Sequence, residues 1–253
     1  MTQQERLGLA RELTGRLLAR HGEGALVAVG VHGPAARGED GDGCDLDLAV
    51  VTAGAEVAVP DRLLLYRGTV VDLATITADA YLEEAGQIGP AWPLAADQYL
   101  HQLALHDPGD FFHKLRHVHE AAVEQAGDEA FLAAAGYDLV QLLSWEARAR
   151  AAELRGDLAA TATAVKESAV LAALVVGLLA RTPYRDLAHA LRATATTGAV
   201  PGGFTADYRR LLDPAAAPAT QVLALGRATA ALAAAARDAG VPFEAADLDA
   251  FLG

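Results

Sequence analysis

The sequence has a single cysteine, Cys44, among its 253 residues. One thiol cannot form an intramolecular disulfide, so a disulfide-stapled secreted domain is excluded and a reducing compartment is expected. The opening residues, Met1 to Arg6, also lack the basic and apolar regions of a secretory signal peptide. We therefore expect a cytoplasmic protein.

Basic residues are scarce as well. The chain has 20 Lys and Arg against 33 Asp and Glu, which gives a formal net charge of −13. Phosphate contacts require clustered Lys and Arg, so we expect no nucleic-acid partner. A cationic small molecule suits this charge better, although an acidic excess also keeps proteins soluble without any ligand.

Long apolar runs are missing too. The longest, residues 169–180, spans roughly 12 residues, short of the roughly 18 that suggest a membrane span. We expect a buried helix there and no membrane contact. With 53% hydrophobic residues, the chain can bury one large core or two modest ones, and two compact domains are expected.

Apolar patterning in the first half predicts a small sheet with flanking helices. Thr2 to Glu5 has the spacing of a helix capping box, and leucines at helical intervals follow it, so the chain is expected to open with a helix that ends at Gly22. Short apolar or alternating segments predict strands at residues 25–31, 45–51, 63–66, 69–76 and 102–106.

The second half is rich in Ala and Leu with helical periodicity and carries no strand signal. Glycine and proline predict breaks between its helices, the first at Gly136 and the next at Gly156 and Pro183. The expected fold class is α+β. A small mixed β-sheet domain at residues 1–125 is followed by an all-α helical bundle at residues 126–253.

The pattern Asp45-x-Asp47 lies on a predicted strand, and Asp72 lies on another. Alternate residues of a strand project from the same face, so Asp45 and Asp47 can reach one ion. Carboxylates suit Mg²⁺, which completes its shell with water and substrate phosphates. Taken alone, the pattern also fits the solvent face of an edge strand.

A glycine-rich loop precedes this pair. The loop and the aspartates resemble the G-S-x-A-R-G…G-x-S-D-x-D motif of polymerase-β-like nucleotidyltransferases. The matching residues are Gly33-Pro34-Ala35-Ala36-Arg37-Gly38, then Gly41, Gly43 and Cys44-Asp45-Leu46-Asp47.

The first half is similar in order to the kanamycin nucleotidyltransferase family, from the opening Met-Thr-x-x-Glu-Arg through Asp72 to Trp92-Pro93-Leu94. The resemblance implies Mg²⁺-dependent transfer of a nucleoside monophosphate, from ATP or another triphosphate, to a hydroxyl of an aminoglycoside-like antibiotic. It also implies a homodimer, a metal held by the three aspartates, and nucleotide contacts from Gly33, Arg37 and Cys44.

The same resemblance assigns two residues of the helical half. Glu146 corresponds to the general base that deprotonates the acceptor hydroxyl, and Arg150 to a cation near the nucleotide phosphates. These two residues are also four apart on a predicted helix, which is the spacing of an ordinary surface ion pair.

Pro34 departs from the family, which has a serine there that helps to hold the phosphates. Proline offers neither a hydroxyl nor a backbone N–H. Two alternatives therefore stay open: the same chemistry on another small-molecule or protein acceptor, or a binding protein that keeps the fold without turnover.

Overall fold

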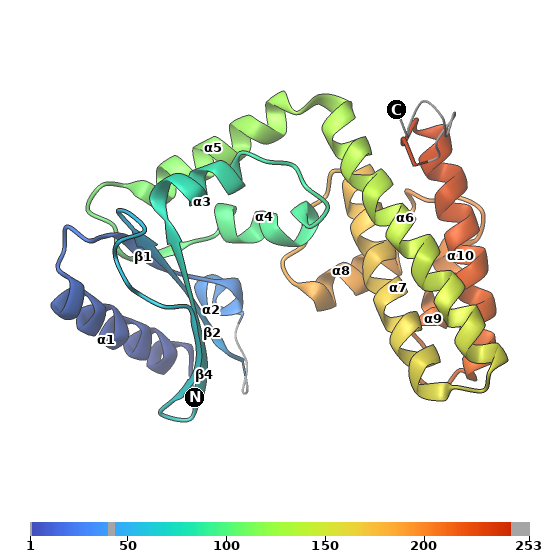
Figure 1. Cartoon of the computed structure of the whole chain (residues 1–253), viewed down its shortest axis with the longest axis horizontal. Helices are drawn as coiled ribbons and strands as arrows, with labels where there is room; N and C mark the ends of the chain where they lie inside the picture. The colour runs from blue at the N-terminus through green and yellow to red at the C-terminus, as the bar shows by residue number, and fades with distance from the viewer. Residues whose placement is uncertain (1, 40–43, 244–253) are drawn as a thin grey trace. The chain divides into compact units, whose positions relative to one another are not determined.

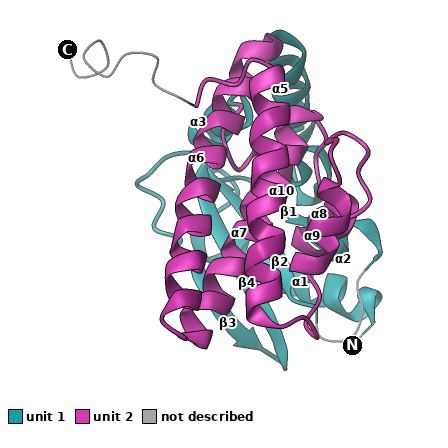
Figure 2. Cartoon of the chain, turned by 90° about the vertical axis from the view of Figure 1, so that its right-hand side faces the viewer, with its two compact units in different colours: residues 1–87, 95–125 teal, residues 88–94, 126–253 magenta. Residues whose placement is uncertain are grey.

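The computed structural model describes residues 2–39 and 44–243. The chain divides into two compact units, one made of Met1–Gln87 and Ala95–Gln125 and the other of Ile88–Leu94 and Ala126–Gly253 (Figure 2). The predicted α+β class is confirmed, because the first unit holds a mixed sheet and the described part of the second holds helices alone.

The first unit is built on a five-stranded sheet in the order β3-β4-β2-β1-β5. Its strands are β1 (Leu26–His32), β2 (Leu46–Thr52), β3 (Arg62–Tyr66), β4 (Thr69–Thr77) and β5 (Leu103–His106). β2 and β4 run parallel, while the other neighbouring pairs are antiparallel. Each strand begins and ends within one residue of the bounds expected from the sequence.

One face of the sheet packs against α1 (Gln3–His21) (Figure 1). The helix begins with the expected capping box: the Thr2 side chain accepts from the Glu5 backbone, and the Glu5 carboxylate accepts from the Thr2 backbone. The α1-side core includes Leu9 and Ala10 of the helix and, from the strands, Leu26, Val29, Val31, Leu46, Leu48, Val50, Val71 and Leu73.

The opposite face is covered at one end by α3 (Ala78–Ala85) and α5 (Phe111–Gln125). These helices bury Tyr81, Phe112 and Leu115 against Ala28 and Ala49 of the sheet. Two further helices belong to this half of the chain: α2 (Gly33–Arg37) directly after β1, and α4 (Trp92–Leu100) before β5.

The second unit contains α6 (Gly127–Leu154), α7 (Leu158–Leu179), α8 (Leu187–Thr194), α9 (Phe204–Leu211) and α10 (Pro218–Asp238). The long helices α6 and α7 form a hairpin around Gly156, and α10 packs on both (Figure 1). Residues 88–94 belong to this unit because Trp92 packs edge-on against Phe131 and the Pro93 carbonyl accepts from the Tyr184 backbone N–H.

The expected helix break at Gly136 is wrong, since α6 continues through it. A Cβ at this position would lie 2.5 Å from the Pro242 carbonyl oxygen. The glycine therefore serves close packing of the segment after α10 against α6, and that contact outweighs its low helix propensity.

Two helices in the described part of the chain, α7 and α10, are long and apolar enough to cross a membrane by length and composition. Within the protein, 56% and 44% of their most apolar windows are buried. Core helices of a water-soluble bundle meet the same criterion.

Candidate active site

Four strands place one residue each in a row across the sheet. Asp47 of β2 is the register partner of His32 on β1 and of Asp72 on β4, and Asp72 is in turn paired with Leu63 on β3. The flanking residues Leu46, Leu48, Val71 and Leu73 belong to the α1-side core. Because strand side chains alternate, the row faces away from α1.

The row is accessible. Asp72 is exposed, and Asp47 and His32 are half-buried. Asp45, also exposed, stands two residues before Asp47 at the start of β2 and so belongs to the same face. The sheet thus brings the three predicted carboxylates to one patch.

The carboxylates interact electrostatically. Burial, followed by the negative charges of Asp45 and Asp72, raises the pKa of Asp47 to about 6. The positive charge of Arg37 opposes this shift. The negative charges of Asp45 and Asp72 therefore disfavour ionisation of Asp47, and a bound cation would relieve the repulsion among the three carboxylates.

Among the described residues, no three His, Cys, Asp or Glu side chains are placed, as they stand, to hold one metal ion. The donor chemistry nevertheless fits a hard cation, because three carboxylates share the patch and two of them are direct register partners. For all three carboxylates to bind one ion, the aspartate side chains would have to rotate toward one another.

Gly33 follows β1 and borders the row. Its φ is +70°, a conformation that favours glycine, and a Cβ on it would lie 2.5 Å from Asp47 Oδ2. Any larger residue would displace the Asp47 carboxylate. Gly33, which the resemblance assigns to nucleotide binding, therefore also leaves space for the Asp47 carboxylate.

Arg37 ends α2 and is largely buried. Its guanidinium forms an ion pair with the buried Asp97 on α4, and its Nε donates to Glu39 at 3.2 Å. Asp97 also contacts His101 Nδ1 at 3.0 Å. Among the described atoms, Arg37 Nη2 is buried without a hydrogen-bond partner.

Pro34 lies in the first turn of α2, where its lack of an N–H is compatible with a helix. Its carbonyl accepts from the backbone N–H groups of Gly38 and Glu39. The Gln3 side chain donates to the Ala35 carbonyl at 3.0 Å and so ties this loop to α1. Pro34 thus fits the fold, and it offers neither an N–H nor a hydroxyl donor at this position. Cys44 is half-buried directly before Asp45, and Gly41 and Gly43 of the motif lie outside the described residues.

Comparison with known proteins supports the fold. No protein-family model matches the chain, and no curated protein matches it. A solved nucleotidyltransferase-like protein from Exiguobacterium sibiricum matches with a TM-score of 0.51 and 12% identity, covering 90% of this chain and 74% of that one. The chain has a nucleotidyltransferase-like fold.

The helical unit holds the other two predicted residues. Glu146, nearly buried, forms an ion pair with the more exposed Arg150 one turn later on α6. A Cβ on Gly226 of α10 would lie 2.9 Å from Arg150 Nη2 and 3.4 Å from Glu146 Oε1, so this glycine lets the pair pack on α10. The arrangement is the i,i+4 pair that the spacing allowed, and the assignments of Glu146 as a base and Arg150 as a phosphate ligand stay predictions.

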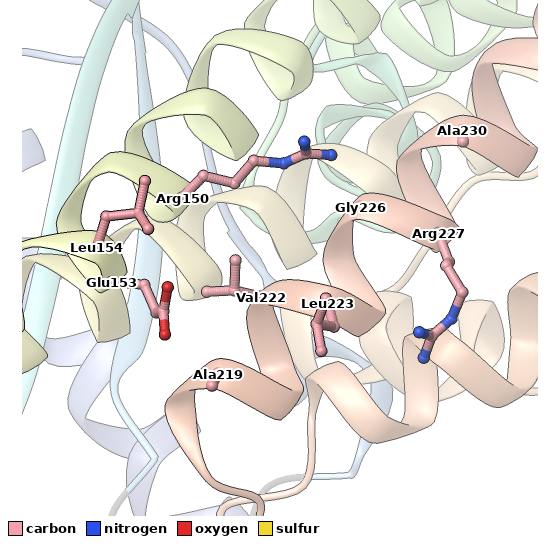
Figure 3. A pocket seen from close by; sticks show the side chains of 9 residues that line it. All are labelled: Arg150, Glu153, Leu154, Ala219, Val222, Leu223, Gly226, Arg227 and Ala230. Carbon is pink, nitrogen blue, oxygen red and sulfur yellow. The ribbon is translucent and has the colours of Figure 1, made fainter.

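Arg150 also lines a cavity of about 560 Å³ within this unit (Figure 3). The other lining residues come from α6 and α10: Glu153, Leu154, Ala219, Val222, Leu223, Gly226, Arg227 and Ala230. They are mostly apolar, and Arg227 is paired with Asp207. None of the three sheet carboxylates contributes to this cavity.

His32 and Asp97 are not among the site residues predicted from the sequence. Burial lowers the pKa of His32, so its imidazole sits beside the carboxylates as a weak base. His32 is the last residue of β1, immediately before the glycine loop, and this position in the sequence could have indicated a residue of the site. Asp97 gave no local signal, since its partner Arg37 is distant in sequence.

Proposed function

We propose that this protein transfers a nucleoside monophosphate from a nucleoside triphosphate, such as ATP, to a hydroxyl group of a small acceptor. The observation that carries the proposal is the register pairing of Asp47 with Asp72, beside Asp45 and the glycine loop, on the sheet face opposite α1. The nucleotidyltransferase-like fold supports the same chemistry.

In this reaction the acceptor oxygen forms a bond to the α-phosphorus, and the bond from that phosphorus to the oxygen bridging the β-phosphate breaks. Pyrophosphate leaves, and the hydroxyl proton passes to a base. Asp45, Asp47 and Asp72 would hold Mg²⁺, which neutralises charge on the phosphates. Gly33 leaves space beside Asp47, and Arg37 has a nitrogen, Nη2, without a hydrogen-bond partner among the described atoms that would donate to the triphosphate.

The acceptor favoured by the resemblance is an aminoglycoside-like antibiotic. Exposed carboxylates on the site and an overall charge of −13 favour a cationic molecule. The resemblance further supports a homodimer, with Glu146 as the base and Arg150 near the phosphates, and the single cysteine favours a cytoplasmic location. These roles belong to the proposal.

The test is a mass measurement. Purified protein is incubated with ATP, Mg²⁺ and a panel of hydroxylated acceptors that includes aminoglycosides. The proposal expects an acceptor product heavier by one nucleoside monophosphate and an equal amount of pyrophosphate, with both lost on chelation of the metal. Nucleotide binding without any product across the panel would instead favour a binding protein, the alternative that Pro34 motivates.

A further inference from the structure

Three apolar side chains lie exposed at the edge of the candidate site. Leu63 and Leu65 of β3 are 73% and 72% exposed, and Val70 of β4 is 43% exposed. The alternating residues of β3, Leu64 and Tyr66, pack instead against the α1-side core. Leu63, Leu65 and Val70, which we call the β3 strip, therefore face the side of the sheet that carries the aspartates.

The sheet register joins the strip to the carboxylates. Leu63 is the direct partner of Asp72, and Leu65 is the direct partner of Val70. Adjacent strands lie about 4.8 Å apart, so Leu63 stands roughly 10 Å from Asp47, with Asp72 between them. A molecule bound at Asp72 and extending toward the sheet edge must cover this strip.

The two reactants approach Asp47 from different sides. Gly33 and Arg37, the groups suited to the triphosphate, follow β1, whereas Asp72 and the strip belong to β4 and β3 on the other side of β2. In phosphoryl transfer, the attacking and leaving oxygens lie roughly in line through the phosphorus. With pyrophosphate leaving on the β1 side, the hydroxyl must attack from the β4 side.

We propose that the β3 strip binds a hydrocarbon portion of the acceptor that adjoins its reactive hydroxyl. This inference rests on the proposed nucleotidyl transfer and narrows its substrate to amphiphilic molecules, such as amino sugars that carry an alkyl or acyl chain. The hydrocarbon portion lies against Leu63, Leu65 and Val70, next to Asp72 at the edge of the sheet.

The composition of the strip supports an apolar ligand. Edge strands of soluble proteins are usually protected by charged side chains, because an exposed apolar edge invites association. Here two of the exposed positions of the edge strand β3 are leucines. Covering them with a hydrocarbon chain removes apolar surface from water, whereas a fully polar acceptor gains nothing from that surface.

The experiment compares pairs of amino-sugar acceptors that differ only in an alkyl chain of about four carbons beside the hydroxyl. Product formation is measured by mass for the intact protein with ATP and Mg²⁺. We expect kcat/KM to be at least tenfold higher for the alkylated member, and Leu63→Ser with Leu65→Ser to reduce that ratio severalfold. Leu158→Ser, at a similarly exposed leucine of α7, is the matched control and should keep the wild-type ratio.

Equal kcat/KM values for both members of each pair would overturn the inference. An unchanged ratio of the two kcat/KM values in the doubly substituted protein would also overturn it. If sedimentation then showed that these substitutions convert a dimer to a monomer, the β3 strip would be assigned to contact with a second copy of the chain. Slow Mg²⁺-dependent release of pyrophosphate from ATP with water as acceptor is measured in parallel. Its absence in the wild type would count against the proposed function itself, separately from the acceptor class.

Discussion

Asp47 on β2 and Asp72 on β4 are direct register partners across the parallel strand pair of the sheet. The strand connecting them in sequence, β3, lies at the sheet edge, so two carboxylates separated by 24 residues come to share one row. This pairing is the basis of the candidate site, and Gly33, Pro34 and Arg37 lie on the loop and helix that follow the neighbouring strand β1.

Pro34→Ser is expected to lower the apparent KM for nucleotide at saturating acceptor. The substitution restores a backbone N–H and a hydroxyl in the first turn of α2, and a hydrogen bond to a charged group typically contributes about 1.5–3 kcal/mol. Steady-state kinetics with varied ATP measure the effect. An unchanged or higher KM would show that another group already holds the phosphates.

Asp97→Asn should destabilise the first unit by roughly 3 kcal/mol, because it leaves the buried Arg37 guanidinium without its main counter-charge. Chemical denaturation measures the change, with Asp79→Asn at an exposed position of α3 as the control. A loss below about 0.5 kcal/mol, the range of ordinary surface substitutions, would mean that Glu39 and solvent suffice to satisfy Arg37.

Asp138 predicts a pH dependence of stability. This α6 residue is buried, its Oδ2 has no hydrogen-bond partner among the described atoms, and burial raises its pKa to about 7. An acid with a raised native pKa binds more protons folded than unfolded, so its contribution to stability is complete below about pH 4 and is lost as pH rises toward 7.

Asp138→Asn should therefore increase the free energy of unfolding at pH 8 by roughly 2–4 kcal/mol relative to wild type, since each pKa unit corresponds to about 1.4 kcal/mol. The difference should shrink toward pH 4. Denaturation curves at several pH values, with exposed Asp238→Asn as the control, measure it. A variant that is less stable than wild type at pH 8 would contradict the assignment.

Glu146→Gln separates the two roles of this side chain. A general base contributes about 10²–10⁴-fold, so the proposal expects kcat to fall by that factor with little change in nucleotide affinity. Glu153→Gln, two turns further along α6, is the control. Normal kcat with a small loss of stability would leave Glu146 as half of the ion pair with Arg150.

The sequence predicts the strands closely because their apolar segments are bounded by clear turn residues, as at Arg67-Gly68 between β3 and β4. It does not predict strand order, since the parallel pairing of β2 with β4 depends on contacts across the sheet. Tertiary contacts also explain the errors. The low helix propensity of Gly136 predicts a helix break, but the close packing of Pro242 against this glycine is accommodated within the continuous helix α6.

The candidate site was predictable where its residues lie close in sequence, as with Gly33, Arg37, Asp45 and Asp47. Asp72 was placed on a neighbouring strand, yet its exact pairing with Asp47 required the structure. The contacts of Arg37 with Asp97, and the exposure of Leu63 beside Asp72, depend on residues brought together only by folding.

We propose above that Asp47 and its neighbouring carboxylates support metal-dependent nucleotidyl transfer. Its most direct test is pyrophosphate release from ATP and acceptor, measured with and without Mg²⁺ for wild type, Asp47→Asn and Asp79→Asn. We expect Mg²⁺-dependent pyrophosphate release by the wild type and by Asp79→Asn. We expect Asp47→Asn to retain the fold but to release pyrophosphate several orders of magnitude more slowly. Wild-type release by Asp47→Asn would contradict it.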